Sequence, residues 1–198
     1  MNIQEFENYL KKKDKKHVIF DFDQTLATLL IDWSVWREEM KEIFSSYGID
    51  FDSRKSEYNK YAEIQNYCIE KYGNEAEKIF LEMNYKHEKE YYRGYDLLPT
   101  TLPLLNSIKN QAELYLWTSN DKRTIAPILE ELKIEKLFKK IITRNDVRYI
   151  KPSSDGFFSI YDKNIPKAEY LFIGDSPVDI GAGKEAGVDF INIAEIKL

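Results

Sequence analysis

Cysteine is almost absent from this sequence, since Cys68 is the only one. A single cysteine cannot form an intrachain disulfide, and it is typical of proteins that work in a reducing compartment. Cys68 lies between Tyr67 and Ile69 with no histidine beside it, which favours a packed core thiol over a reactive one. We therefore expect a cytoplasmic protein.

Long apolar runs are also missing. No stretch of the chain approaches the roughly 18 apolar residues that a membrane-crossing helix needs. The segment Met1–Lys16 is polar and lacks the apolar region of a signal peptide. The sequence therefore predicts a soluble protein with neither a membrane anchor nor a secretion signal.

The chain lacks an excess of positive charge. It carries 29 lysines and arginines against 34 aspartates and glutamates, for a net charge of -5. Binding to a nucleic-acid backbone needs a concentrated basic surface, so this balance argues against nucleic acid as a partner. The basic clusters at Lys11–Lys13 and Lys15–Lys16 are better explained as a solvated helix end and turn. Internal repeats and low-complexity tracts are absent as well.

The composition that remains is that of an ordinary globular protein. The chain has 198 residues, 43% of them hydrophobic and 32% charged, which suits one compact domain with room for an insertion. Short apolar strands alternate with helical stretches, which predicts an α/β fold: a three-layer sandwich around a doubly wound, mostly parallel sheet. The expected strands are 17–20, 114–117, 140–143, 170–173 and 189–193, and the expected helices are 3–13, 102–109, 125–132 and 157–161.

One long segment interrupts this alternation. Residues 28–96 contain no clear strand, and their apolar and aromatic side chains recur at helical spacing. Gly48 and Gly73 end two of these helical stripes. We expect a helical block inserted after the first strand, closed by Leu97-Leu98-Pro99.

Chemically active side chains follow three of the expected strands. Because parallel strands end at one edge of a sheet, this edge should gather acids, hydroxyls and an amine from the preceding loop. These residues are Asp21, Asp23, Thr118, Ser119, Lys151, Asp175 and Asp179. Several carboxylates together need a cation, and hard oxygen ligands favour Mg²⁺. A hydroxyl and an ammonium suit phosphoryl oxygens, and the acids could supply a nucleophile and a general acid–base.

The order of these motifs resembles that of the haloacid dehalogenase-like hydrolase superfamily. The matching elements are Asp-x-Asp-x-Thr at 21–25, Thr118-Ser119, Lys151-Pro152 and Gly-Asp-x-x-x-Asp at 174–179. The resemblance covers the chain from about His17 to its end. It implies a capped phosphatase whose core is 1–27 and 97–198, with 28–96 as the α-helical cap.

The resemblance also implies a role for each matching residue. Asp21 would be the nucleophile that forms an aspartyl phosphate, and Asp23 the acid–base whose backbone carbonyl also reaches Mg²⁺. Thr118, with Ser119 after it, would hold the phosphoryl oxygens, and Lys151 would neutralise their charge. The expected metal set is Asp21, Asp23, Asp175 and Asp179, with Asp179 completing or orienting the shell around the ion.

Two details refine this expectation. The family often has glycine where this chain has Gln24, which predicts either an ordinary backbone or a tolerated strained one. The dehalogenases of the superfamily lack the second acid, so Asp23 points to phosphate esters. Substrate could also meet cap residues near the two connections, although packing within the cap explains them too. These candidates are Trp33, Trp36, Arg37, Tyr92 and Arg93.

Competing functions follow from the same residues. A sugar phosphomutase would share the catalytic set and differ by returning the phosphoryl group to the product. A phospho-accepting receiver domain also joins acids, a threonine and a lysine, but should lack the helical insertion. A catalytically inactive binding scaffold is the third alternative. The expected partner is a small phosphorylated metabolite, and the oligomeric state stays open, a monomer included.

Overall fold

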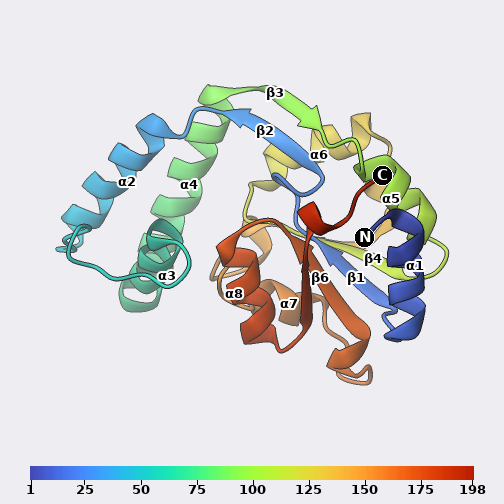
Figure 1. Ribbon diagram of the computed structural model, residues 1–198. Helices are drawn as coiled ribbons and strands as arrows, with labels where there is room; N and C mark the ends of the chain where they lie inside the picture. The colour runs from blue at the N-terminus through green and yellow to red at the C-terminus, as the bar shows by residue number, and fades with distance from the viewer.

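A computed structural model describes residues 1–198, and its centre is a five-stranded parallel sheet (Figure 1). The strand order is β5-β4-β1-β6-β7, which places the first strand of the chain in the middle. The strands are β1 (His17–Phe20), β4 (Glu113–Trp117), β5 (Phe138–Ile142), β6 (Tyr170–Gly174) and β7 (Asp189–Asn192). The predicted α/β class and the doubly wound parallel sheet are confirmed.

Alternating side chains of the central strands build a core on each face of the sheet. In β1, Val18 and Phe20 pack on one side, while Ile19 points to the other. Helices α1 (Ile3–Lys12), α5 (Thr101–Ile108) and α6 (Lys122–Glu131) cover the first side. Helices α7 (Asp155–Ile160) and α8 (Pro177–Ala186) cover the second. Because both faces are covered, all four residues of β1 are buried.

Three of the four helices between β1 and β4 form a separate body beside this sandwich (Figure 1). They are α2 (Ser34–Ser46), α3 (Lys60–Tyr72) and α4 (Asn74–Tyr91). Their apolar faces enclose a hydrophobic cluster of their own that includes Met40, Phe44 and Phe80. Cys68 lies in this cluster and is fully buried, as the sequence predicted.

Two strands at the ends of the helical block differ from the prediction of a block without strands. β2 (Ala27–Ile31) and β3 (Tyr92–Leu97) pair antiparallel and form a two-stranded ribbon. Ala27 lies opposite Leu97, so the chain enters and leaves the block at adjacent points. Short strands whose burial alternates poorly give little periodic signal, which explains why the pattern did not reveal them. Four 3₁₀ helices complete the chain: η1 (Glu135–Leu137), η2 (Arg144–Asp146), η3 (Lys167–Glu169) and η4 (Ile193–Glu195).

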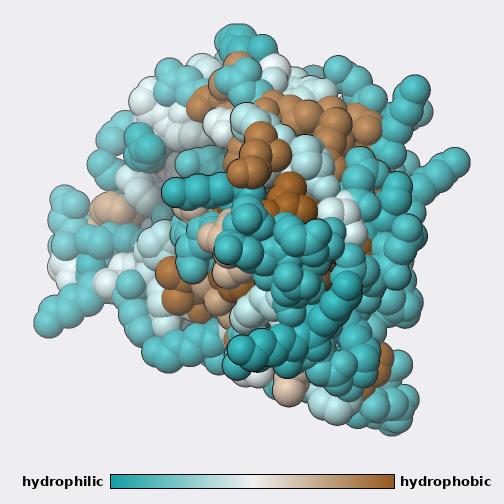
Figure 2. All heavy atoms as spheres, turned by 45° about the vertical axis from the view of Figure 1, so that its right-hand side comes forward, coloured by the Kyte–Doolittle hydropathy of each residue, from teal (hydrophilic) through white to brown (hydrophobic).

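The surface is mostly hydrophilic on the face that Figure 2 shows, with small, separate hydrophobic patches. The large apolar side chains that are exposed come from distant parts of the chain, such as Leu30, Ile79 and Phe158. Isolated exposed apolar residues are normal for a globular protein. No helix is both long and apolar enough to cross a membrane.

Candidate active site

The carboxyl ends of β1, β4 and β6 meet at one edge of the sheet, and Asp21 lies at the centre of that edge. Its backbone N–H donates to the carbonyl of Ile173 at 2.9 Å, which extends the pairing of β1 with β6 by one residue. The side chain of Asp21 is nearly buried. Burial raises the pKa of this carboxyl, and the nearby Lys151 ammonium opposes that rise.

Lys151 joins two of the acids. Its Nζ lies 2.5 Å from Asp21 Oδ1 and 2.5 Å from Asp179 Oδ1, and it also donates to the carbonyl of Trp117 at 3.3 Å. Only 3% of Lys151 is exposed. Burial alone would lower the pKa of Lys151, but Asp179 and Asp21 raise it above its usual value. The ammonium therefore stays charged in the site.

Asp21, Asp175 and Asp179 each offer a carboxylate oxygen within 4.8 Å of the others. This donor set contains oxygen only, which is what Mg²⁺ prefers in proteins, so the residues fit the ion. Asp175 is held by the Thr25 hydroxyl, which donates to its Oδ1 at 3.3 Å, and Asn192 donates to its backbone carbonyl. Burial raises the pKa of the Asp175 carboxyl, and the nearby Asp179 adds to that rise.

Both carboxylate oxygens of Asp179 already have protein partners. Oδ1 contacts Lys151, while Oδ2 accepts from the backbone and the hydroxyl of Ser176, at 3.1 and 2.5 Å. Asp179 is fully buried at the start of α8. A Cβ at Gly174 would lie 2.6 Å from the Asp179 Cβ, so only glycine fits there. The geometry thus supports the orienting role for Asp179 over direct coordination.

Asp23 stands apart from the metal-ligand cluster. Its Oδ1 accepts from the backbone N–H of Leu29 at 2.8 Å, and burial raises its pKa to about 6 despite that bond. A carboxyl that titrates near neutrality suits general acid–base work. The following residue, Gln24, has φ 59°, so the strained of the two expected backbones is observed. Its N–H donates to the carbonyl of Ala27 at 2.7 Å, which closes this turn.

The Thr118 hydroxyl is hydrogen-bonded to Asn120, which was not among the predicted site residues. The hydroxyl donates to Asn120 Oδ1 at 2.6 Å, and the Asn120 N–H donates back to the hydroxyl oxygen at 3.1 Å. Thr118 does not cap the following helix, because Asp121 does so by accepting from the Arg123 N–H. Ser119 and Asn120, rather than Thr118, line the pocket.

The pocket over these acids has a volume of about 370 Å³ and is walled by the core and by the helical block. Asp21, Asp23, Lys151 and Asp175 form its floor, and Trp33, Trp36 and Arg37 contribute to its wall. The two tryptophans also pack edge to face, with ring centroids 5.6 Å apart, so they hold the helical block together as well.

Tyr92 and Arg93 are not brought to this pocket. Tyr92 lines a different cavity, between α4 and α6. The exposed Arg93 donates from Nη1 to the carbonyls of Glu90 and Tyr92. Both residues were predicted at the site because they precede the point at which the chain leaves the helical block. They lie instead at the start of β3, outside the pocket that contains the acids.

Several residues that line the pocket were not predicted from the sequence. Asn84 and Gln65 are buried on α4 and α3, where Asn84 accepts from the Trp36 indole at 2.7 Å and donates to Gln65 at 3.3 Å. Arg144 is buried behind the Ser119 carbonyl, to which its Nε donates at 2.6 Å. Polar side chains on the apolar stripe of a helix are the signal that could have revealed the first two.

Comparison with known proteins agrees with this architecture. The family model described as haloacid dehalogenase-like hydrolase matches residues 18–193. The chain therefore belongs to the haloacid dehalogenase-like hydrolase family. The resemblance drawn from the motifs is confirmed.

Individual relatives and solved structures resemble the chain over most of its length. A phosphoglycolate phosphatase of Pseudomonas savastanoi pv. phaseolicola is 27% identical over 195 residues, covering 92% of this chain and 71% of the relative. A Bacteroides fragilis structure, provisionally described as a haloacid dehalogenase-like hydrolase, has a TM-score of 0.63 and 27% identity, covering 89% and 86% of the two chains. A subfamily IA hydrolase of Geobacter sulfurreducens shares the fold, with a TM-score of 0.58, 22% identity and coverage of 90% and 87%.

Proposed function

We propose that this protein is a Mg²⁺-dependent phosphatase that hydrolyses a small phosphorylated metabolite through an aspartyl-phosphate intermediate. The observation that carries the proposal is the buried bridge from Lys151 to Asp21 and Asp179 at the meeting point of three strand ends. The family membership and the relatives named phosphoglycolate phosphatase support a phosphoric monoester hydrolase.

Each residue of the site has a task in this reaction. The Asp21 carboxylate attacks phosphorus and displaces the alcohol, to which Asp23 gives a proton. Asp23 then takes a proton from the water that hydrolyses the aspartyl phosphate. Lys151 and the Ser119–Asn120 turn receive the phosphoryl oxygens. Asp21, Asp175 and the backbone carbonyl of Asp23 would hold Mg²⁺, which when bound would neutralise phosphate charge.

The division of the chain is part of the same proposal. Residues 1–27 and 97–198 form the catalytic core, and residues 28–96 form a cap over the acidic edge. The separate hydrophobic cluster of α2, α3 and α4 supports this boundary, as does the pairing of Ala27 with Leu97. A body attached at two adjacent points can tilt as a unit and close the site to bulk water.

The test is release of inorganic phosphate from a panel of phosphate monoesters with and without Mg²⁺. Phosphoglycolate is the first substrate to try, because relatives carry that name, and p-nitrophenyl phosphate serves as a generic ester. We expect activity that is abolished by a chelator and by Asp175→Ala. Full activity in excess chelator would contradict the metal requirement, and transfer of phosphate within the substrate without release would indicate a mutase.

A further inference from the structure

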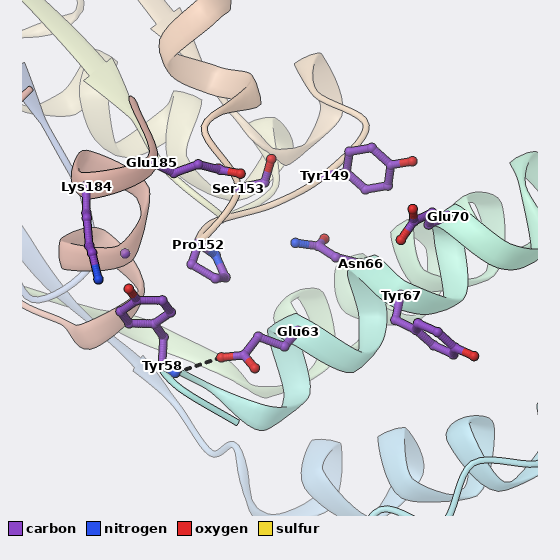
Figure 3. A pocket seen from close by; sticks show the side chains of 11 residues that line it. Tyr58, Glu63, Asn66, Tyr67, Glu70, Tyr149, Pro152, Ser153, Lys184 and Glu185 are labelled. Carbon is purple, nitrogen blue, oxygen red and sulfur yellow. Dashed lines mark hydrogen bonds between the residues drawn. The ribbon is translucent and has the colours of Figure 1, made fainter. Parts of the chain in front are cut away.

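A side-chain amide of the cap pairs with the backbone of the loop that carries Lys151. Asn66 lies on α3, and its Nδ2 donates to the carbonyl of Ile150 at 2.7 Å. The N–H of Ile150 donates back to Asn66 Oδ1 at 3.0 Å. The two bonds repeat the donor and acceptor pattern between paired strands, although 84 positions separate the residues. Figure 3 shows Asn66 pointing from α3 toward this loop.

The pair lies between two cavities. Ile150 lines the pocket that contains the acids. Asn66 lines an outer cleft of about 660 Å³ between α3, the loop and α8, which Figure 3 views from close by. The pair is therefore a contact between cap and core at the wall that divides the active site from the outer cleft.

The Tyr149 ring of the loop packs against the hydrophobic cluster of the cap, whereas the loop's other hydrogen bonds are made to the core. Asp155 accepts from the Tyr149 N–H at 3.0 Å, and Glu185 of α8 accepts from the N–H of Ser154. Asn66 provides the two hydrogen bonds between α3 and this loop, and both are made to the residue immediately before Lys151. The position of the lysine backbone is thus fixed partly by the core and partly by the cap.

We propose that Asn66 is a positioning residue, which couples closure of the cap to the placement of Lys151 against Asp21. When the cap tilts away, Ile150 loses both bonds and the loop regains freedom. When the cap closes, the amide sets the loop and with it the ammonium. Because small misplacements of a catalytic group lower the rate strongly, the chemistry proceeds efficiently only under a closed cap. This inference rests on the proposed phosphatase function.

Two variants of Asn66 test the coupling, with a third as control. Asn66→Asp keeps the shape but places carboxylate oxygens against the Ile150 carbonyl, and Asn66→Ala removes both bonds. Glu70→Gln is the matched control, because Glu70 is one turn further along α3, faces the same cleft and is exposed. Kinetics with phosphoglycolate and p-nitrophenyl phosphate, thermal unfolding, and exchange of the Ile150 amide hydrogen are measured for each protein.

We expect both Asn66 variants to lower kcat by roughly 10–100-fold on both esters, with KM changed much less. The Ile150 amide should exchange several-fold faster in Asn66→Ala, and Glu70→Gln should match wild type throughout. Unchanged kcat in a folded Asn66→Ala protein would overturn the coupling. So would a wild-type Ile150 amide that exchanges as fast as the variant's. A wild-type protein that releases no phosphate but protects Ile150 would defeat only the proposed phosphatase function.

Discussion

Asp21 is buried and lies beside two other acids, and burial and the neighbouring Asp179 both raise the pKa of its carboxyl. Only 6% of it is exposed, and the oxygens of Asp175 and Asp179 lie within 4.8 Å. Lys151 offsets part of the repulsion with one charge, and under the proposed function a divalent cation would offset the remainder. With those two charges beside it, the proposed nucleophile at the centre of the sheet edge would be ionised and suited to attack phosphorus.

Replacement of Asp21 by asparagine should abolish turnover while the protein still folds. The amide is nearly isosteric with the carboxylate but cannot form the phosphorylated intermediate, so we expect kcat to fall by about 10⁴-fold or more. Phosphate release and the hydroxylamine-labile phosphoryl label on the protein are measured together, with thermal unfolding as the control for folding. Turnover at the wild-type rate would exclude Asp21 as the covalent residue.

The strand-end acids could be located from the sequence because a short apolar run fixes where a buried strand ends. Asp21, Asp175 and Lys151 were expected at one edge, and the structure brings them together there. Asn66 and Arg144 were not found, since the direction of a helix relative to the core decides what such side chains face. The amphipathic pattern of 28–96 reports helices but not their orientation.

At the scale of elements, the β2–β3 ribbon was missed for a related reason. Its strands carry mixed burial, and their pairing joins Ala27 to Leu97 across the whole insertion. A periodic pattern identifies a strand that is buried on one or both faces, whereas this ribbon is a connection with little core of its own. The central strands, buried on both sides, gave clear apolar runs.

The start of β1 should make stability depend on pH. Burial lowers the pKa of His17, while Glu113, 3.1 Å from its Nδ1, opposes that shift. The folded protein binds the proton less readily than the unfolded chain, whose histidine titrates near 6.5. This contribution is therefore present above pH 6.5 and is lost as the pH falls below it. The ring also lies against Tyr115 and Tyr170, and the other charges near it are Lys16, Lys139 and Glu169.

We expect His17→Phe, which keeps a ring to stack on Tyr170, to lose less stability than wild type between pH 7 and pH 5. Urea unfolding at several pH values measures the difference between the two proteins, which cancels the other titrating groups. A difference that does not change with pH would mean that His17 has the same pKa in the folded and unfolded chains.

A buried ion pair links α4 of the helical block to η2 beside the central sheet. Glu88 Oε1 lies 2.6 Å from Arg144 Nη2, and Glu88 Oε2 accepts from the Thr124 hydroxyl at 2.6 Å. Both charged side chains are nearly buried. Removing one partner leaves an uncompensated charge, so Glu88→Leu should lower the free energy of unfolding by about 3–5 kcal/mol.

The double variant provides the control for this prediction. Glu88→Leu with Arg144→Leu removes both charges, and we expect its loss of stability to be smaller than the sum of the two single losses by about 1–3 kcal/mol. Urea denaturation of the four proteins closes the cycle. Strictly additive losses would show that the two side chains contribute independently.

At the scale of the whole molecule, Arg37 and Arg93, the two arginines predicted from the sequence to contact substrate, lie in different environments. Arg37 follows the first connection and lines the pocket with the acids, while Arg93 follows α4 and bonds to backbone carbonyls away from it. The arrangement gives a pocket with Lys151 on the core side and a second cation on the cap side. A substrate that carries an anionic group beyond its phosphate could span the two.

We therefore expect Arg37→Ala to lower kcat/KM for a phosphorylated carboxylic acid such as phosphoglycolate by roughly 10–100-fold, the loss of one charged hydrogen bond. The same variant should spare p-nitrophenyl phosphate, because its nitrophenyl group carries no net charge for Arg37 to bind. Arg93→Ala is the matched control and should leave both substrates unaffected. Because Arg37 is exposed on α2, its removal should barely change the melting temperature. Equal losses on both esters with a lower melting temperature would instead assign Arg37 to the packing of the cap, and the substrate would have to be recognised by other residues of the pocket wall.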